Sequence, residues 1–361
     1  MNETKHLTKV NLALIGFGRA GQFHFRNIFA DYRVQLSWIV EEDVVRANQV
    51  VQNYSLTSTT VIKSKEIDQV WRDDSVNAVI ICTPTWTHES LVRAALKAGK
   101  HVLCEKPISP SIDSIKSLFA EARSHDRVLF CAFNRRFDPG VSSLKSRIRN
   151  GEIGQIQHVK TISRDFPPPS LSYLKTSGGI FHDCAIHDID LTSWLAGEAP
   201  CMVYAQGHAF NKSIHEIGDL DTLSIVLKFP SGILGTIDVS RYAAYGYDQR
   251  TEVLGSEGMI QNNNCRPCEL AIHKGGSGKM ENPIYQSCPE RYNDSYKHEL
   301  NHFIDVVKGE KNKCEVTAEE SIMASVVAEA CNKSYKLGRP VNIVNGEIIT
   351  STMTALNGKE E

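Results

Sequence analysis

The sequence lacks the features that mark membrane, secreted and nucleic-acid-binding proteins. Its formal net charge is only −2, so no excess of one sign is available to attract a nucleic acid or a membrane surface. No apolar run approaches the length that spans a bilayer. Residues 1–9 are polar and contain no apolar stretch of the kind found in secretory signals. We therefore expect a globular cytoplasmic protein that binds neither nucleic acid nor a membrane.

The cysteines show no spacing typical of a disulfide scaffold or a metal site, although there are 10 of them. Cys82, Cys104 and Cys131 lie in apolar, strand-like runs, where a free thiol behaves as a small hydrophobic group. Cys265 and Cys268 form one CxxC without a matching second pair, whereas a zinc site takes about four ligands. We expect reduced, structural cysteines and no bound metal.

With 361 residues, the chain is too long for one ordinary core, and two domains are expected. The first, residues 1–133, alternates strand-like and helical runs, which predicts an α/β domain with a doubly wound parallel sheet. The second, residues 134–345, has β-rich runs joined mostly by turns, which favours an open, mainly antiparallel sheet. A polar tail is expected at residues 346–361. The predicted strands cover 10–15, 34–40, 77–82, 101–104 and 128–132, then 156–164, 202–207, 223–229, 235–241 and 251–255.

A glycine motif follows the first predicted strand and opens a helix. In Gly16-Phe17-Gly18-Arg19-Ala20-Gly21, the first glycine permits a tight turn, the second lets a pyrophosphate approach the backbone, and the third allows close packing of helix and strand. The helix N-terminus would offer amide donors to the phosphates. The alternative is a glycine turn without a ligand. The position between strand and helix favours a dinucleotide site.

The second predicted strand ends at Glu41 and Glu42, about twenty positions after the glycines. A carboxylate there accepts hydrogen bonds from the ribose of NAD and repels the extra phosphate of NADP. Glu41, the first residue after the strand, is the better candidate. No arginine follows immediately, and Arg46 is a helical turn or more away. The sequence therefore predicts NAD as the cofactor.

Two further predicted strands end in short motifs. Cys82-Thr83-Pro84-Thr85-Trp86-Thr87-His88 follows one strand, and Glu105-Lys106-Pro107 follows the next. Ligands of parallel sheets bind beyond the carboxyl ends of the strands. We therefore expect the cofactor to contact residues of both motifs, namely Thr83, Pro84, His88, Glu105 and Lys106.

A glycine turn at residues 177–179 leads into a helix that carries Asp183, His187 and Asp190. Residues four apart lie on one face of an α-helix, so Asp183 and His187 are expected to point the same way. A carboxylate beside an imidazole can move a proton near neutral pH. The alternative is a capped helix whose Asp and His are only solvated or bonded to backbone.

GFGRAG, CTPTWTH, EKP and SGGIFHDCAIHDID, in this order, make the chain similar to the glucose–fructose oxidoreductase/inositol dehydrogenase (Gfo/Idh/MocA) family, from Val10 to Val344. Within it, NRRFD, SRDFPPPSLSYLKTSGG and YGYD most resemble myo-inositol 2-dehydrogenases. The resemblance implies an NAD-binding Rossmann domain. It also implies a C-terminal α/β domain whose open sheet forms the contact of a homo-oligomer, a tetramer or a dimer. It assigns catalysis to Lys106, Asp183 and His187.

The expected reaction is NAD-dependent oxidation of a secondary hydroxyl of a cyclic polyol, most simply of myo-inositol to its 2-keto form. His187 would be the general base, Asp183 would fix its tautomer, and Lys106 would stabilise alkoxide character on the reacting oxygen. For Asn134, Arg136, Asp190 and Tyr247, polyol contacts and ordinary structural hydrogen bonds are equally open. The alternatives are a related sugar or dihydrodiol dehydrogenase and a non-catalytic NAD-binding regulator. The presence of Lys106, Asp183 and His187 together favours an enzyme.

Overall fold

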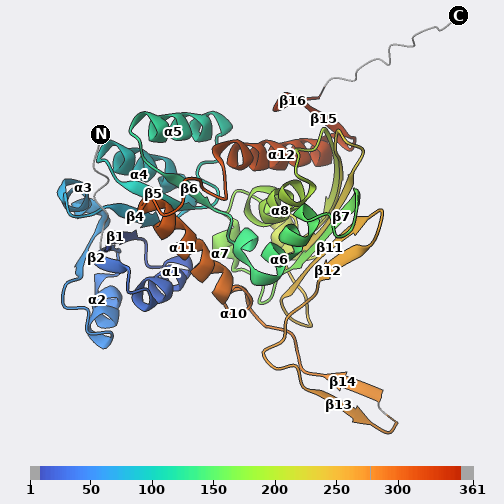
Figure 1. Ribbon diagram of the computed structural model, residues 1–361, viewed down its shortest axis with the longest axis horizontal. Helices are drawn as coiled ribbons and strands as arrows, with labels where there is room; N and C mark the ends of the chain where they lie inside the picture. The colour runs from blue at the N-terminus through green and yellow to red at the C-terminus, as the bar shows by residue number, and fades with distance from the viewer. Residues whose placement is uncertain (1–8, 277, 351–361) are drawn as a thin grey trace, which may run out of the picture.

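The structure is a computed structural model that describes residues 9–276 and 278–350, and it contains two large sheets (Figure 1). The N-terminal sheet has six parallel strands in the order β3-β2-β1-β4-β5-β6. This is the order of a Rossmann domain, and it reverses between β1 and β4. The strands are β1 (Val10–Ile15), β2 (Val34–Val40), β3 (Thr60–Ile62), β4 (Ala78–Ile81), β5 (His101–Glu105) and β6 (Leu129–Ala132). The predicted doubly wound parallel sheet is confirmed.

Helices cover both faces of this sheet, which is why its central strands read as continuous apolar runs. All residues of β4 are buried, as expected for a strand packed on both sides. The helices are α1 (Arg19–Ala30), α2 (Val44–Asn53), α3 (Asp68–Arg72), α4 (Thr85–Lys97) and α5 (Ile112–Ser124), with a short 3₁₀ turn at Ser64–Glu66. Side-chain caps define two of the helix starts: Asp43 accepts from the Arg46 amide at α2, and Ser111 accepts from the Ser114 amide at α5.

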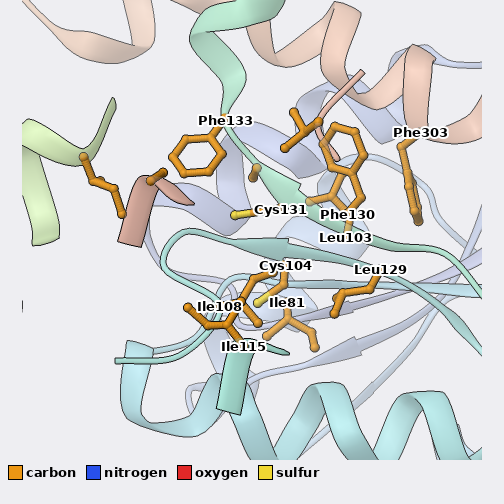
Figure 2. Close-up of a cluster of buried hydrophobic side chains, with 14 of the residues drawn as sticks. Ile81, Leu103, Cys104, Ile108, Ile115, Leu129, Phe130, Cys131, Phe133 and Phe303 are labelled. Carbon is orange, nitrogen blue, oxygen red and sulfur yellow. The ribbon is translucent and has the colours of Figure 1, made fainter. Parts of the chain in front are cut away.

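Figure 2 shows the part of the hydrophobic core that lies around the last three strands of this sheet. Ile115 of α5 lies on one face of the sheet and Phe303 of the later helix α11 (Asn293–Val307) on the other. Phe130 of β6 meets Phe303 with ring centroids 6.1 Å apart. Helix α11 also packs on α1, so a helix from the C-terminal part of the chain completes the N-terminal core.

The C-terminal sheet has eight strands in the order β12-β11-β7-β10-β9-β8-β15-β16. All neighbouring pairs are antiparallel except β7 and β10, which confirms the mainly antiparallel sheet. The strands are β7 (Ile156–Arg164), β8 (Met202–His208), β9 (Thr222–Lys228), β10 (Leu234–Ser240), β11 (Asp248–Gly255), β12 (Met259–Asn262), β15 (Val341–Val344) and β16 (Glu347–Ile349). The polar tail expected from residue 346 therefore begins as a strand of this sheet, and residues 351–361 lie outside the described residues.

Helices cover one face of this sheet and leave the other open (Figure 1). In β9, Leu223, Ile225 and Leu227 are buried under helices, whereas Ser224 and Val226 are exposed on the opposite face. The covering helices include α8 (Ile186–Ala196) and α12 (Ala318–Leu337), and α12 also contacts α5 of the Rossmann domain. The remaining helices are α6 (Pro139–Arg149), α7 (Leu171–Leu174), α9 (Lys212–Glu216) and α10 (Cys288–Arg291), with a 3₁₀ turn at Asn134–Phe137.

A two-stranded hairpin, β13 (Ala271–Lys274) and β14 (Gly278–Glu281), projects from the body of the molecule (Figure 1). Sequence analysis did not predict it, because its strands are short and polar. Among the described residues, no helix combines the length and the apolar character needed to cross a membrane.

Candidate active site

The glycine turn between β1 and α1 has the backbone that a dinucleotide phosphate requires. Gly16 has φ +91°, and a Cβ there would lie 2.7 Å from the carbonyl oxygen of Cys82. A Cβ at Gly21 would lie 2.1 Å from the carbonyl oxygen of Gly16, so helix and turn are in contact. At Gly18 an added Cβ would meet nothing within 4 Å, which leaves that side open. No side chain caps α1, so its first amides are free to bind an anion. The turn therefore fits the pyrophosphate of NAD.

Glu41, at the carboxyl end of β2, turns its side chain towards the glycine turn. The Phe17 amide donates to Glu41 Oε2 over 2.7 Å. Glu42 points away and accepts from Ser64, a hydrogen bond that holds the pKa of Glu42 below its usual value. Glu41 is thus the carboxylate placed for the ribose. The expectation that Arg46 lies away from this position was wrong, because α2 folds back and brings Arg46 Nη2 to 3.5 Å from Glu41 Oε1 and 3.1 Å from the Phe17 carbonyl.

The loops after β4 and β5 are fastened together by His88. Its side chain is 1% exposed, with Nδ1 2.8 Å from the Pro107 carbonyl and Nε2 2.8 Å from the Thr83 carbonyl. Burial lowers the pKa of His88. Both ring nitrogens are used inside the protein, and the contact of His88 with the cofactor stays a prediction. Thr83 and Pro84 are at least partly exposed at the carboxyl-end edge of the N-terminal sheet. Thr83 Oγ1 lies 2.6 Å from Thr87 Oγ1.

Glu105 is also used internally. Its Oε1 lies 3.0 Å from Nε2 of His24, a fully buried residue of α1. Burial would raise the pKa of Glu105, but the hydrogen bond from His24 and the charge of Lys106 hold it below its usual value. Glu105 therefore joins the end of β5 to the helix that follows the glycine turn. This contact positions α1, and the contact of Glu105 with the cofactor stays a prediction.

Lys106 and Asp183 meet where the two domains adjoin. Lys106 Nζ donates to the Asp183 carbonyl over 2.6 Å and lies 3.6 Å from Asp183 Oδ1. Asp183 Oδ1 also accepts from the Tyr173 hydroxyl at 2.6 Å, and Oδ2 accepts from Arg241 at 2.9 Å. Burial would raise the pKa of Asp183, but the charges of Lys106 and Arg241 lower it. Asp183 is therefore a carboxylate that anchors Lys106.

The predicted hydrogen bond between Asp183 and His187 is not formed. Residues Phe181–Ala185 make a π-helical turn ahead of α8. A π turn bonds residues five apart, so the four-residue spacing of an α-helix does not bring Asp183 over His187. His187 Nδ1 is buried without a hydrogen-bond partner among the described residues. Burial, with the charges of Lys106 and Arg135, holds the pKa of His187 well below 6.5. His187 therefore carries a neutral imidazole, and the residue as a whole is partly exposed.

The other residues proposed for the substrate lie in the interior. Arg136 and Asp190 are 2% and 3% exposed and form a bidentate pair, with a second carboxylate from Glu320. Asn134 is buried against Ser295. Tyr247 is buried and meets Tyr292 edge to face at 6.0 Å. Of the two interpretations left open for these four side chains, these contacts favour the structural one, and contact with a polyol stays a prediction.

Sequence reasoning missed two partners of Asp183. Arg241, at the end of β10, is 1% exposed and bridges Asp183 and Asp219, both at 2.9 Å. Tyr173, in α7, is 42% exposed, and its hydroxyl donates to Asp183. The only sequence signal for Tyr173 was its place in SRDFPPPSLSYLKTSGG, a stretch that carries the family resemblance. Nothing local to Arg241 indicates that it reaches Asp183.

Comparisons with known proteins agree with this arrangement. Residues 10–133 match the model of an oxidoreductase family with an NAD-binding Rossmann fold, and residues 141–261 match the GFO/IDH/MocA C-terminal domain. The chain is 37% identical to a myo-inositol 2-dehydrogenase of Thermotoga maritima, over 92% of this chain and 98% of that one. It is 35% identical to the uncharacterized oxidoreductase YrbE of Bacillus subtilis, over 93% and 97%.

Among solved structures, a myo-inositol dehydrogenase from Corynebacterium glutamicum superimposes with a TM-score of 0.86 at 32% identity, covering 93% of this chain and 99% of that one. The family model that matches residues 10–133, the glycine turn and the placement of Glu41 agree on NAD as the cofactor. The chain is an NAD-dependent oxidoreductase acting on CH–OH groups, and it belongs to the GFO/IDH/MocA family.

Proposed function

We propose that this protein oxidises a secondary ring hydroxyl of a cyclic polyol, with myo-inositol and its 2-hydroxyl as the first candidate. The observation that carries the proposal is an anchored ammonium close enough to a neutral imidazole for its charge to lower the pKa of that imidazole. Lys106 is held by Asp183, and His187 has a ring nitrogen without a partner among the described residues. The likeness to a myo-inositol 2-dehydrogenase along nearly the whole chain supports the choice of polyol.

The proposed roles follow from the charge states. His187 is neutral because burial and Lys106 lower its pKa, so it can accept the hydroxyl proton. Lys106 donates a hydrogen bond to the same oxygen and stabilises its developing negative charge. NAD, when bound, accepts the hydride from the carbon. Asp183, fixed by Tyr173 and Arg241, keeps the Lys106 ammonium in place. The Glu41 carboxylate favours the ribose hydroxyls of NAD over the extra phosphate of NADP.

A substrate panel tests this proposal. Myo-inositol, scyllo-inositol, glucose and a dihydrodiol are each incubated with NAD or NADP, and the absorbance of the reduced nicotinamide is followed. We expect turnover of an inositol with NAD. Myo-inositol deuterated at C2 should transfer its deuterium to the cofactor, and the same compound deuterated at another carbon is the matched control.

Each alternative gives its own result in this panel. Turnover of glucose or the dihydrodiol without any inositol would make the protein the related dehydrogenase. NAD binding by calorimetry without turnover of any compound would make it a regulator. Deuterium transfer from a carbon other than C2 would leave polyol oxidation standing and contradict the assigned position.

We also propose that the second domain, residues 134–345, joins copies of the chain through the open face of its sheet, as a dimer or a tetramer. Val226, Leu234 and Leu254 are 40–46% exposed on that face. Leu234 and Leu254 are both register partners of His158, so they share one side of the sheet. Sedimentation of wild type and of Val226→Lys with Leu234→Lys tests it. We expect a smaller species for the variant, and a wild-type monomer would contradict the proposal.

The ten cysteines support a reducing compartment, and we propose the cytoplasm. All are free thiols, from the buried Cys104 to the exposed Cys268. Equal amounts of folded protein from reducing and oxidising expression compartments would contradict the assignment.

A further inference from the structure

A cavity of about 670 Å³ lies outside the candidate active site. We call it the α6–α11 cavity, because α6 and α11 form two of its walls, together with the end of α8 and the segment 311–315. Its volume is within the range of about 300–1,000 Å³ typical of small-molecule sites. Lys106, Asp183 and His187 are not among its lining residues in the described part of the chain. The residues that line the cavity include Lys145, Arg149, Trp194, His302, Lys311 and Glu315.

Lys145 places a buried ammonium in the wall of this cavity. Its side chain comes from α6, is 8% exposed, and donates to the carbonyls of Trp194 and Leu195 at the end of α8. No carboxylate of the described residues lies within ion-pair distance of Lys145. Burial, with the charges of Arg149 and Arg136, lowers the pKa of Lys145 to about 8. The cavity wall thus carries positive charge that the described residues leave incompletely balanced.

In the side chain of His302, the N–H at Nδ1 faces the ammonium group of Lys311, which is also a hydrogen-bond donor. The ring is 7% exposed, and Nε2 accepts the backbone N–H of Glu315 at 2.9 Å. A neutral imidazole that accepts at Nε2 carries its proton on Nδ1. The group next to Nδ1 is the Lys311 ammonium, 3.4 Å away, which can only donate. Burial and the charge of Lys311 lower the pKa of His302, so the ring is neutral. The pair therefore calls for an acceptor oxygen that the described residues do not supply.

The carboxylates of the cavity leave room for such an acceptor. Asp305 lies 3.3 Å from Lys311 but also receives Arg33 at 2.7 Å. Glu315 lies 3.5 Å from Arg149, a loose contact between half-exposed side chains. Both Arg149 and Lys311 are at least 50% exposed, so they can turn towards a ligand without unfolding anything. Three cations around one cavity suit an anion with more than one negative charge.

We propose that the α6–α11 cavity binds a small organic molecule through a multiply charged oxyanion group, a phosphate ester or a polycarboxylate. One oxygen of that group accepts from His302 Nδ1 and Lys311 Nζ, and the group lies in the field of Lys145 and Arg149. The site is independent of the proposed reaction. It would be present whichever CH–OH substrate the enzyme uses.

Titration calorimetry tests the site in phosphate-free buffer at constant ionic strength. NAD is kept at saturation, because the free amides at the start of α1 would otherwise also take a phosphate. The probes are ethyl phosphate and citrate, with acetate as the monoanion control. Neither probe has a ring hydroxyl, so neither mimics the proposed substrate. Saturable binding of ethyl phosphate identifies the phosphate class, and binding of citrate identifies the carboxylate class. Binding of neither, or of acetate equally well, would overturn the proposal.

Variants locate the binding. Arg149→Ala with Lys311→Ala removes two exposed cations of the cavity, and Arg147→Ala is the matched control. Arg147 is on the same helix, is 56% exposed, and pairs with Glu152 outside the cavity. We expect the double variant to lose affinity by about tenfold or more, since each hydrogen bond to a charged group contributes substantially, and the control to bind as wild type does. Lys311→Gln alone should show part of the loss. Equal affinity in all variants would place the anion elsewhere and refute the site.

Discussion

The candidate site has a cofactor half at the glycine turn and a catalytic half at the π turn, and the two halves are held in place in different ways. At the glycine turn, Gly16, Gly18 and Gly21 shape the backbone, and Glu41 reaches it from 24 residues away. At the π turn, Asp183 depends on Arg241 and Lys106, which are 58 and 77 residues away. The cofactor half is therefore built mostly from local backbone geometry, and the catalytic half from side chains that only the complete fold brings together.

This difference makes the two halves respond differently to substitution. A change in the catalytic half should reduce turnover and leave NAD binding intact. A change at the ribose end should alter the choice of cofactor and leave the chemical step intact. For His187 and Lys106, kcat/KM and NAD affinity are both measured, so that a mixed response would break the comparison.

The largest effect is expected at His187. Replacement by Ala should lower kcat/KM by roughly 10²- to 10⁴-fold, the usual contribution of general acid–base catalysis. Because the pKa of His187 lies well below 6.5, wild-type activity should be level at neutral pH and fall only in acid, as the ring gains a proton. That acid limb should vanish in His187→Ala. NAD titration is the control, and an unchanged pH profile would show that another group is the base.

Lys106→Ala should cost roughly 10²- to 10³-fold in kcat/KM, as does loss of one donor to a developing oxyanion. NAD affinity should persist. The charge of Lys106 is one cause of the low pKa of His187, so the acid limb of the remaining activity should move towards neutral pH. Rates measured across a pH series test both effects. Equal losses in NAD affinity and turnover would make Lys106 a cofactor ligand instead.

At the ribose end, Glu41→Ser should shift the preference towards NADP by about tenfold or more, on the scale of one hydrogen bond to a charged group. Removal of the carboxylate frees Arg46, now 3.5 Å away, to receive the 2′-phosphate. Glu41→Ser with Arg46→Ala should lose that gain. Glu42→Ser is the matched control and should change nothing, because Glu42 is bonded to Ser64. The ratio of kcat/KM for the two cofactors is the measurement.

Most of the fold could be predicted from the sequence, because apolar runs and glycines act locally. The runs at 34–40 and 156–164 match β2 and β7 residue for residue. The parallel pairing of β10 with β7 could not be predicted in this way, because the two strands are far apart in the chain. Strands β15 and β16 were missed because they are short and follow a long helix.

The candidate site was predicted less completely, for three physical reasons. The spacing of Asp183 and His187 assumed an α-helix, whereas the chain forms a π turn there. Arg136 and Asp190 were grouped with polyol contacts because they are polar, but the fold brings them together as a buried ion pair. Arg46 was placed by its distance along the chain, although α2 turns it back onto Glu41.

Tyr173 gives the smallest expected effect and the sharpest test of how the catalytic half is connected. Tyr173→Phe removes one hydrogen bond to Asp183 and leaves no buried charge unpaired, since Arg241 and Lys106 remain. A hydrogen bond to a charged group is worth about 1.5–3 kcal/mol, but Tyr173 is 42% exposed and water can replace its hydroxyl, so kcat/KM should fall by only roughly two- to tenfold. If Asp183 acts by anchoring Lys106, adding Tyr173→Phe to Lys106→Ala should cost almost nothing further, because residues of one unit are non-additive. If Asp183 instead acts on His187, the loss should persist in Lys106→Ala and disappear in His187→Ala. Thermal unfolding of each variant, and Tyr245→Phe as an exposed control away from Asp183, show whether the effect is local to this network.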